Sequence, residues 1–258
     1  MLLTVDIGNT NVCMGLMPER GVLASHIRFP TDKRRTVEEF MENFEALVAM
    51  QHFDFSGVTG AIVSSVVPEL TDSVVASVHA KAGRDPMVVR HDMNLGFTID
   101  MDTPERLGAD MIADAAGAVN DYEGALAIYD MGTATTCSIV SADKVYLGSI
   151  IIPGVVISQD ALTAKASQLP FIKFEQPKHL IGRETVDCMR SGMVYGNAAM
   201  LDGLTDRIAD ELGEPVTAVV TGGVSKLIVP ACRRSVIYDP DLLLKGLWDL
   251  HELNGTSV

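Results

Sequence analysis

Two short segments combine a carboxylate, a glycine and several hydroxyl or amide side chains, which is a set of groups suited to phosphate binding. They read Asp6-Ile-Gly-Asn-Thr-Asn11 and Asp130-Met-Gly-Thr-Ala-Thr-Thr136. A tight glycine turn presents backbone N–H groups to an anion, and hydroxyl groups add further donors. The Asp at the strand end can hold a cation, or its bound water, against that anion. The segments predict two phosphate-binding turns, with a nucleotide clamped between two related domains.

The surroundings of the two turns are also alike. Each turn follows an apolar run, Leu2–Val5 or Ala125–Tyr129, and each leads into a second apolar strand. Residue 130 lies 124 positions after residue 6, close to half of the 258-residue chain. Such spacing is typical of an internal duplication. Two ordinary hairpin turns are the alternative, since Gly beside Asn or Thr is common turn chemistry. The matching context favours the nucleotide interpretation.

A third glycine element follows the predicted strand Val216–Val220 and reads Thr221-Gly-Gly223. Without Cβ atoms at this point, a flat and bulky ligand can approach the backbone closely. Taken alone, the pattern is more often a plain strand-to-helix turn. Its position after two phosphate turns favours an adenosine site.

Composition and charge limit the class of protein. The formal net charge is −14 and the sequence pI is about 4.7, which argues against nucleic acid or an anionic membrane surface as the main partner. No signal peptide is expected at the N-terminus, and no apolar stretch reaches the length of a membrane span. The four cysteines show no metal-binding or disulfide spacing. These features predict a cytoplasmic protein with free thiols.

The order of elements predicts an α/β fold with mixed sheets. A strand meander is followed by alternating helices and strands, and the plan then repeats. We expect two domains, residues 1–120 and 121–258. The predicted elements include a third strand at Val22–Ile27 and helices at Pro104–Asn120, Thr185–Leu212 and Asp241–Leu253.

Eight ordered segments give the chain a family resemblance. They are Asp6–Asn11, Ser65–Pro68, Gly108–Asp110, Asp130–Thr136, Gly148–Gly154, Ile181–Thr185, Thr221–Gly223 and Gly246–Leu250. With these segments the chain resembles the sugar-kinase/actin/chaperone-ATPase superfamily, whose two duplicated ribonuclease-H-like domains clamp ATP. Within that superfamily it is most similar to type III pantothenate kinase. The resemblance implies ATP-dependent phosphorylation of pantothenate to 4'-phosphopantothenate, the first step of coenzyme A biosynthesis.

On the nucleotide side, the resemblance implies a set of ATP contacts and a cation ligand. The ATP contacts are Asp6, Ile7, Gly8, Asn9, Thr10, Asn11, Val12, Cys13, Thr133, Gly222 and Gly223. Asp130 resembles the family's ligand for a monovalent cation, potassium or ammonium. Mg²⁺ would arrive with ATP.

On the acceptor side, the resemblance implies that Asp110 is the general base, with substrate contacts from Gly108, Ala109, Asp110, Met111, Met101 and Thr185. From the residues alone, Asp110 could equally be a first-turn Asp favoured by the helix dipole. The family's acceptor pocket includes Thr185 of the facing subunit, so a homodimer is expected. Interface candidates on that helix are Met189, Met193, Ala199 and Leu201, which would serve equally well in an internal core.

Three positions depart from the family pattern, all on the acceptor side. Met111 replaces an arginine that helps to hold the acceptor, Met101 replaces a tyrosine, and Ala166 stands where a threonine is usual. Loss of a guanidinium removes a charge and a bidentate donor together. Two alternatives therefore stay open: a kinase for a different small hydroxylated acceptor, and a non-catalytic nucleotide-binding regulator. The presence of Asp110 argues against the regulator.

Overall fold

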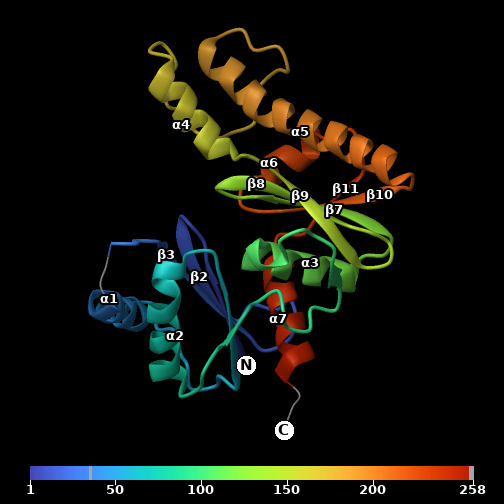
Figure 1. The fold of residues 1–258 in the computed structure, drawn as a ribbon. Helices are drawn as coiled ribbons and strands as arrows, with labels where there is room; N and C mark the ends of the chain where they lie inside the picture. Colours follow the sequence, from blue (N-terminus) through green and yellow to red (C-terminus); the bar gives the residue numbers. More distant parts are fainter. Residues whose placement is uncertain (35–36, 256–258) are drawn as a thin grey trace. The chain divides into compact units, whose positions relative to one another are not determined.

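Two sheets with the same connectivity organise the chain, in a computed structural model that describes residues 1–34 and 37–255 (Figure 1). One sheet belongs to a first unit made of Met1–Asp121 and Asp241–Val258, and the other to a second unit, Tyr122–Pro240. The chain first passes from one unit to the other after Asp121. The C-terminal segment, from Asp241 onward, groups with the first unit, because its helix packs on a helix of that unit.

The sheet of the first unit has the strand order β3-β2-β1-β4-β5. Its strands are β1 (Leu2–Ile7), β2 (Asn11–Met17), β3 (Ser25–Pro30), β4 (Gly60–Ser65) and β5 (Met87–Val88). Strands β1, β2 and β3 form an antiparallel meander, whereas β4 and β5 run parallel to β1. Alternate residues of β1, namely Leu3, Val5 and Ile7, are fully buried in one core with the helices on that side. The other face of β1 carries Asp6.

The third strand begins later than the pattern Val22–Ile27 predicted. Val22 instead belongs to the β2–β3 turn, where it forms an isolated bridge with Glu19. Gly21 has a φ of 74°, a left-handed conformation that turns the chain at this point. Strand pairing therefore starts only at Ser25, which lies opposite Leu16.

Four α-helices accompany this sheet: α1 (Val37–Met50), α2 (Pro68–Ala82), α3 (Ala109–Asp121) and α7 (Leu242–Gly255). Helices α1 and α2 lie side by side (Figure 1). The predicted helix from Pro104 was wrong at its start. A short 3-10 turn, η1 (Pro104–Arg106), follows the small strand β6 (Thr98–Ile99) and ends where Leu107 is extended. Helix α3 is therefore a separate element, and Asp110 lies in its first turn.

Helices α3 and α7 pack backbone against backbone. A Cβ atom on Gly246 would overlap the carbonyl oxygen of Ala113, and one on Gly117 would lie 2.7 Å from the carbonyl oxygen of Leu242. Arg20 adds an ion pair to each helix, with Asp121 at 2.8 Å and Asp249 at 2.6 Å. Close glycine contacts and shared charges thus hold the C-terminal helix to the first unit.

The second unit repeats the arrangement: the strands that belong to this unit lie in the order β11-β10-β7-β8-β9, within a sheet of six strands. Its elements are β7 (Ala125–Met131), β8 (Ala134–Val140), β9 (Val145–Pro153), α4 (Val155–Lys165), α5 (Thr185–Leu212), β10 (Val216–Thr221), α6 (Ser225–Ile228), η2 (Val229–Ala231) and β11 (Val236–Tyr238). Here β7, β8 and β9 form the antiparallel meander, and β10 and β11 run parallel to β7. The equivalent connectivity confirms the duplicated α/β plan.

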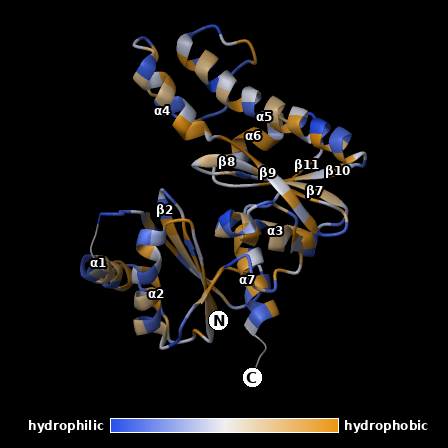
Figure 2. Cartoon of the chain, in the orientation of Figure 1, coloured by the Kyte–Doolittle hydropathy of each residue, from blue (hydrophilic) through white to orange (hydrophobic). Residues whose placement is uncertain are grey.

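Helix α5 begins and ends at the predicted residues. The Glu184 side chain accepts hydrogen bonds from the N–H groups of Val186 and Asp187, and Gly213, with a φ of 72°, ends the helix. Figure 2 shows both hydrophobic and hydrophilic stretches along α5. Three of its four interface candidates, Met189, Met193 and Leu201, are buried in the core of the second unit, whereas Ala199 is exposed.

Among the described residues, no helix has both the length and the apolar character that crossing a bilayer requires. All four cysteines are free thiols.

We predict that Gly246→Ala destabilises the protein by about 1–3 kcal/mol, because the added methyl group forces α3 and α7 apart. Chemical denaturation monitored by circular dichroism would measure the change. Gly196→Ala in α5 is the matched control, since a Cβ there meets no atom within 4 Å and alanine is the better helix former. Equal stabilities of the wild type and the Gly246→Ala variant would contradict the packing argument.

Candidate functional site

The first predicted turn joins β1 to β2, with Asp6 near the end of β1. Asp6 lies opposite Cys13 of β2 and beside Ser64 of β4, so the three side chains share one face of the sheet. Burial, and secondly the charge of Asp6, raise the pKa of the Cys13 thiol, which keeps it neutral. The turn closes with a hydrogen bond from the Gly8 N–H to the Asn11 carbonyl oxygen at 2.9 Å.

The tip of this turn is open to solvent. Asn9 and Thr10 are exposed, whereas Ile7 and Val12 at its base are buried in the core. The side chains of Asn9 and Thr10 are thus accessible to a ligand, whereas the side chains of Ile7 and Val12 pack in the core below the turn. Ser64 was not singled out from the sequence. Its hydroxyl is buried beside Asp6 and has no hydrogen-bond partner among the described residues.

Asp110 occupies a tight position in the first turn of α3. Its Oδ1 accepts a hydrogen bond from the Met111 N–H at 2.8 Å. A Cβ atom on Gly108 would come within 2.5 Å of the same oxygen, so a larger residue at 108 would require this carboxylate to move. Burial raises the pKa of the Asp110 carboxyl, and the Met111 N–H opposes that effect. A carboxyl with a raised pKa is a better proton acceptor than an exposed one.

Asp110 and the Asp6 turn lie at the same edge of the first unit. Val66, which follows β4, donates its N–H to the Ile7 carbonyl oxygen at 3.1 Å. The Val66 side chain would also lie 3.6 Å from a Cβ on Gly108. One residue therefore touches both the phosphate turn and the glycine beside Asp110, two segments about 100 positions apart in the chain.

The other predicted acceptor residues of this unit differ in exposure. Met111 is only 8% exposed and packs within α3's buried surface, and Ala109 is also buried. Met101 is partly exposed between β6 and η1. Neither methionine offers a charge to an anionic acceptor.

The second predicted turn lies in the second unit, between β7 and β8. Asp130 lies opposite Thr136 and beside Thr221 of β10. The turn closes with a hydrogen bond from the Gly132 N–H to the Ala134 carbonyl oxygen at 3.1 Å, and Thr133 at its tip is exposed. Both turns therefore join antiparallel strands and are closed by a hydrogen bond from the glycine N–H, but the second turn is one residue shorter than the first.

Two glycines from distant segments press against this second turn. Gly222 has a φ of 95°, and its Cβ would lie 2.6 Å from Asp130 Oδ1. A Cβ on Gly154 would overlap the Thr133 carbonyl oxygen. The structure thus brings the predicted residues Asp130, Thr133 and Gly222 together, with Gly223 exposed next to them. Gly154 was missed as a site residue, although the Pro153-Gly154 pair after a strand was a usable signal.

Asp130 contributes one carboxylate to the second turn, beside Gly132 and Gly222. The described residues contain no cluster of three or more His, Cys, Asp or Glu side chains able to share a metal ion. Carboxylate and carbonyl oxygens are the ligands of hard cations, so Asp130 is the residue of this turn that could hold one.

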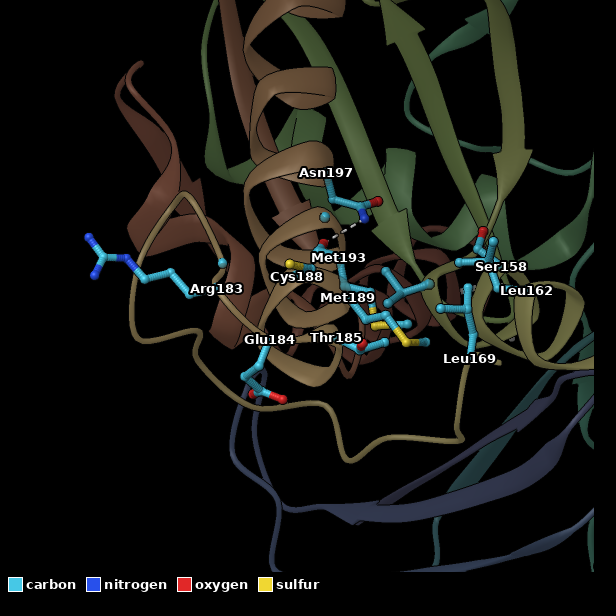
Figure 3. A pocket seen from close by; sticks show the side chains of 13 residues that line it. Ser158, Leu162, Leu169, Arg183, Glu184, Thr185, Cys188, Met189, Met193 and Asn197 are labelled. Atoms are coloured by element: carbon cyan, nitrogen blue, oxygen red, sulfur yellow. Dashed lines mark hydrogen bonds between the residues drawn. The ribbon is translucent and has the colours of Figure 1, made fainter. Parts of the chain in front are cut away.

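Thr185 lines a separate open cavity of about 750 Å³ in the second unit (Figure 3). Side chains of α5, including Met189 and Met193, face Leu162 of α4 and Leu169 across it. The Arg183 side chain extends away from the other labelled side chains. The cavity is mostly apolar, and its polar lining residues are Ser158, Arg183, Glu184, Thr185 and Asn197.

The fold is that of the sugar-kinase and actin-like ATPase class. A solved structure described as a Baf family transcriptional activator from Campylobacter jejuni matches 99% of this chain and 100% of its own length, with a TM-score of 0.61 and 17% identity. A ROK family glucokinase from Streptomyces griseus, solved with glucose and AMPPNP, matches with a TM-score of 0.50, 15% identity and coverage of 99% and 100%. At these identities the likeness concerns the fold alone.

Sequence relatives identify the family. The family described as type III pantothenate kinase matches residues 2–207. Type III pantothenate kinase of Exiguobacterium sibiricum is 38% identical over 98% of this chain and 100% of its own length. That of Bacillus cytotoxicus is 35% identical, with coverage of 98% and 97%. The chain belongs to the type III pantothenate kinase family.

Proposed function

We propose that the protein transfers the γ-phosphoryl group of ATP to the primary hydroxyl of pantothenate, giving 4'-phosphopantothenate and ADP. This is the activity that the family's name describes, and it begins coenzyme A biosynthesis. The observation that carries the proposal is the partly buried Asp110 carboxylate, held beside Gly108 at the same edge as the Asp6 turn.

Asp110 acts as the general base in this proposal. It accepts the proton of the pantothenate hydroxyl while the hydroxyl oxygen forms a bond to the γ-phosphorus. The bond between that phosphorus and the bridging oxygen breaks, and its electron pair leaves with ADP. Little covalent chemistry falls to the protein, so its contributions are positioning and charge neutralisation.

The nucleotide contacts come from backbone-rich turns. In the first unit, the exposed tip formed by Asn9 and Thr10 faces the phosphates, and Asp6 holds water bound to the Mg²⁺ that accompanies ATP. In the second unit, Thr133, Gly222 and Gly223 contact ATP, and Asp130 binds potassium or ammonium. Measuring activity while potassium is replaced by sodium tests the last assignment.

The second unit supplies the remaining part of the acceptor site. In this proposal the protein is a homodimer, and Thr185 of one subunit contacts the pantothenate bound to the facing subunit. Support comes from large apolar side chains that are exposed in the second unit, including Ile181 at 81%, Phe171 at 70% and Ile151 at 70%. Exposed apolar side chains of this size are typical of interfaces. The four free thiols fit a reducing compartment, and we propose the cytoplasm.

One observation favours a second candidate, a kinase for a different hydroxylated acceptor. Met111 is buried and uncharged where the family carries an arginine. An acceptor without a carboxylate would not need that cation.

We predict that Asp110→Asn lowers the rate of phosphoryl transfer by about 10²–10⁴-fold while ATP affinity stays unchanged. The amide has nearly the same shape but cannot take the proton. Burial raises the pKa of Asp110, so the kcat/KM of the wild type falls with decreasing pH at a pH above the pKa of an ordinary Asp. The variant lacks this acidic fall in kcat/KM. A coupled ADP assay across pH, with calorimetric ATP binding, measures both. A variant that retains full activity would rule out Asp110 as the base.

We predict that Met111→Arg tightens pantothenate binding, since a charged hydrogen bond contributes about 1.5–3 kcal/mol. Calorimetry on the wild type and the variant measures the change, and Met111→Leu serves as a control that changes the same position without adding a charge. No activity on pantothenate in either form, together with transfer to another hydroxylated compound, would favour the second candidate.

We predict a dimer at micromolar concentration by sedimentation, and a shift to monomer in the Phe171→Glu, Ile181→Glu double variant. Leu253→Glu, which changes an exposed apolar residue of the first unit, is the control and should leave the dimer intact. A wild-type protein that sediments only as a monomer would exclude the shared acceptor site.

A further inference from the structure

The residue that follows β3 holds the first phosphate turn from outside. The Thr31 hydroxyl donates a hydrogen bond to the Gly8 carbonyl oxygen at 2.6 Å. The Thr31 N–H donates a second one to the Thr10 carbonyl oxygen at 3.0 Å. Thr31 thus donates hydrogen bonds to two carbonyl groups of a turn that lies more than 20 positions earlier in the chain.

These two bonds fix the direction of two N–H groups. In a planar trans peptide the C=O and the following N–H point in opposite directions. Because the Gly8 carbonyl faces Thr31, the Asn9 N–H points away from Thr31. Because the Thr10 carbonyl also faces Thr31, the Asn11 N–H points away as well. Two N–H groups of one turn are therefore directed to the same side, which is the geometry of a backbone anion site.

The Gly8 carbonyl is the critical group in this arrangement. A two-residue hairpin turn closes with reciprocal bonds, here from Gly8 N–H to Asn11 and from Asn11 N–H to Gly8. The first is present at 2.9 Å. At the Gly8 carbonyl, the hydrogen bond in the described turn comes from the Thr31 hydroxyl. That oxygen would otherwise take up the Asn11 N–H and would oppose an incoming phosphate by its partial negative charge.

A cation is added by the same segment. Lys33 Nζ donates to Asn9 Oδ1 at 2.9 Å, which places a positive charge beside the tip of the turn. The net charge of −14 repels a polyanionic ligand from the protein as a whole. The positive charge of Lys33 offsets that repulsion beside the turn.

We propose that Thr31 is a positioning residue for the ATP phosphates: it turns the Gly8 and Thr10 carbonyls outward so that the Asn9 and Asn11 N–H groups face the phosphate chain. This inference rests on the proposed assignment of the Asp6 turn to ATP. It assigns Thr31 no contact with the nucleotide and no part in proton transfer.

The test compares Thr31→Val, which keeps the branched shape without the hydroxyl, with Thr31→Ser, which keeps the hydroxyl. Calorimetry measures the affinities for ATP, ADP and adenosine, and steady-state assays give the KM values for ATP and pantothenate. Thr217→Val in β10 is the control for a Thr-to-Val change in a strand. Thermal unfolding confirms that each variant is folded.

We expect Thr31→Val to weaken ATP and ADP binding about tenfold and to leave adenosine binding and the pantothenate KM unchanged. Thr31→Ser should restore the wild-type values. Equal losses for ATP and adenosine, or no loss for ATP, would overturn the proposal. If Thr31→Val does not fold, Thr31→Ala takes its place, and wild-type ATP affinity in Thr31→Ala overturns the proposal in the same way.

The outcome is independent of the acceptor. A wild-type protein that binds ATP but phosphorylates neither pantothenate nor another acceptor would refute the proposed function and leave the role of Thr31 standing. Normal pantothenate kinase activity with an unaffected Thr31→Val variant would refute only the role of Thr31.

Discussion

In a protein with a formal charge of −14, a site for a polyanion needs a local source of positive potential. Backbone N–H groups meet that requirement if the neighbouring carbonyl oxygens face elsewhere. The turn after β1 satisfies this condition because Thr31 engages two of its carbonyls. The turn after β7 is also closed by a hydrogen bond from its glycine N–H, although that bond spans one residue fewer. Much of the rest of the structure serves to place these turns at strand ends.

Close backbone approach is the second recurring feature. Gly154 and Gly222 lie against the turn at Asp130, Gly108 leaves space for the Asp110 carboxylate, and Gly246 admits the backbone of α3. At Gly154, Gly222 and Gly246 a Cβ atom would meet backbone atoms, which cannot move without disturbing a turn or a helix, and at Gly108 it would displace the Asp110 carboxylate. Such contacts hold functional groups in place without long side chains, whose ordering costs conformational entropy.

The proposed acceptor site is built differently from the proposed nucleotide turns. Asp110 is a single carboxylate whose pKa is raised by its burial, and its surroundings include the apolar Met111. The same desolvation that makes the carboxylate a better base also disfavours an unpaired charge on an acceptor nearby. An anionic acceptor therefore depends on polar groups supplied by other segments, which gives the Met111 position its importance for specificity.

Local patterns predicted the elements whose ends are defined by nearby residues. Helix α5 has the predicted limits because each end is set by the residue next to it. Glu184 caps the start, and the left-handed Gly213 ends the helix. The start of α3 was wrong because Pro104 can open a 3-10 turn as readily as an α-helix, and the break at Leu107 has no local marker. Strand β3 was misplaced because Val22, although apolar, lies in a turn.

The sequence by itself determined the duplication and the two glycine turns, and it supplied the glycine pair at 222 and 223 and Asp110 as candidate site residues, because each is a short run with a local physical meaning. Only the tertiary structure decided which distant residues complete them. Thr31 meets the first turn through β3 pairing, Gly154 meets the second through β9, and Val66 links the Asp6 turn to Gly108. It also placed α7 with the first unit and buried Met189, Met193 and Leu201. These outcomes depend on strand order and helix packing, which join residues far apart in the chain and leave no periodic trace within any one segment.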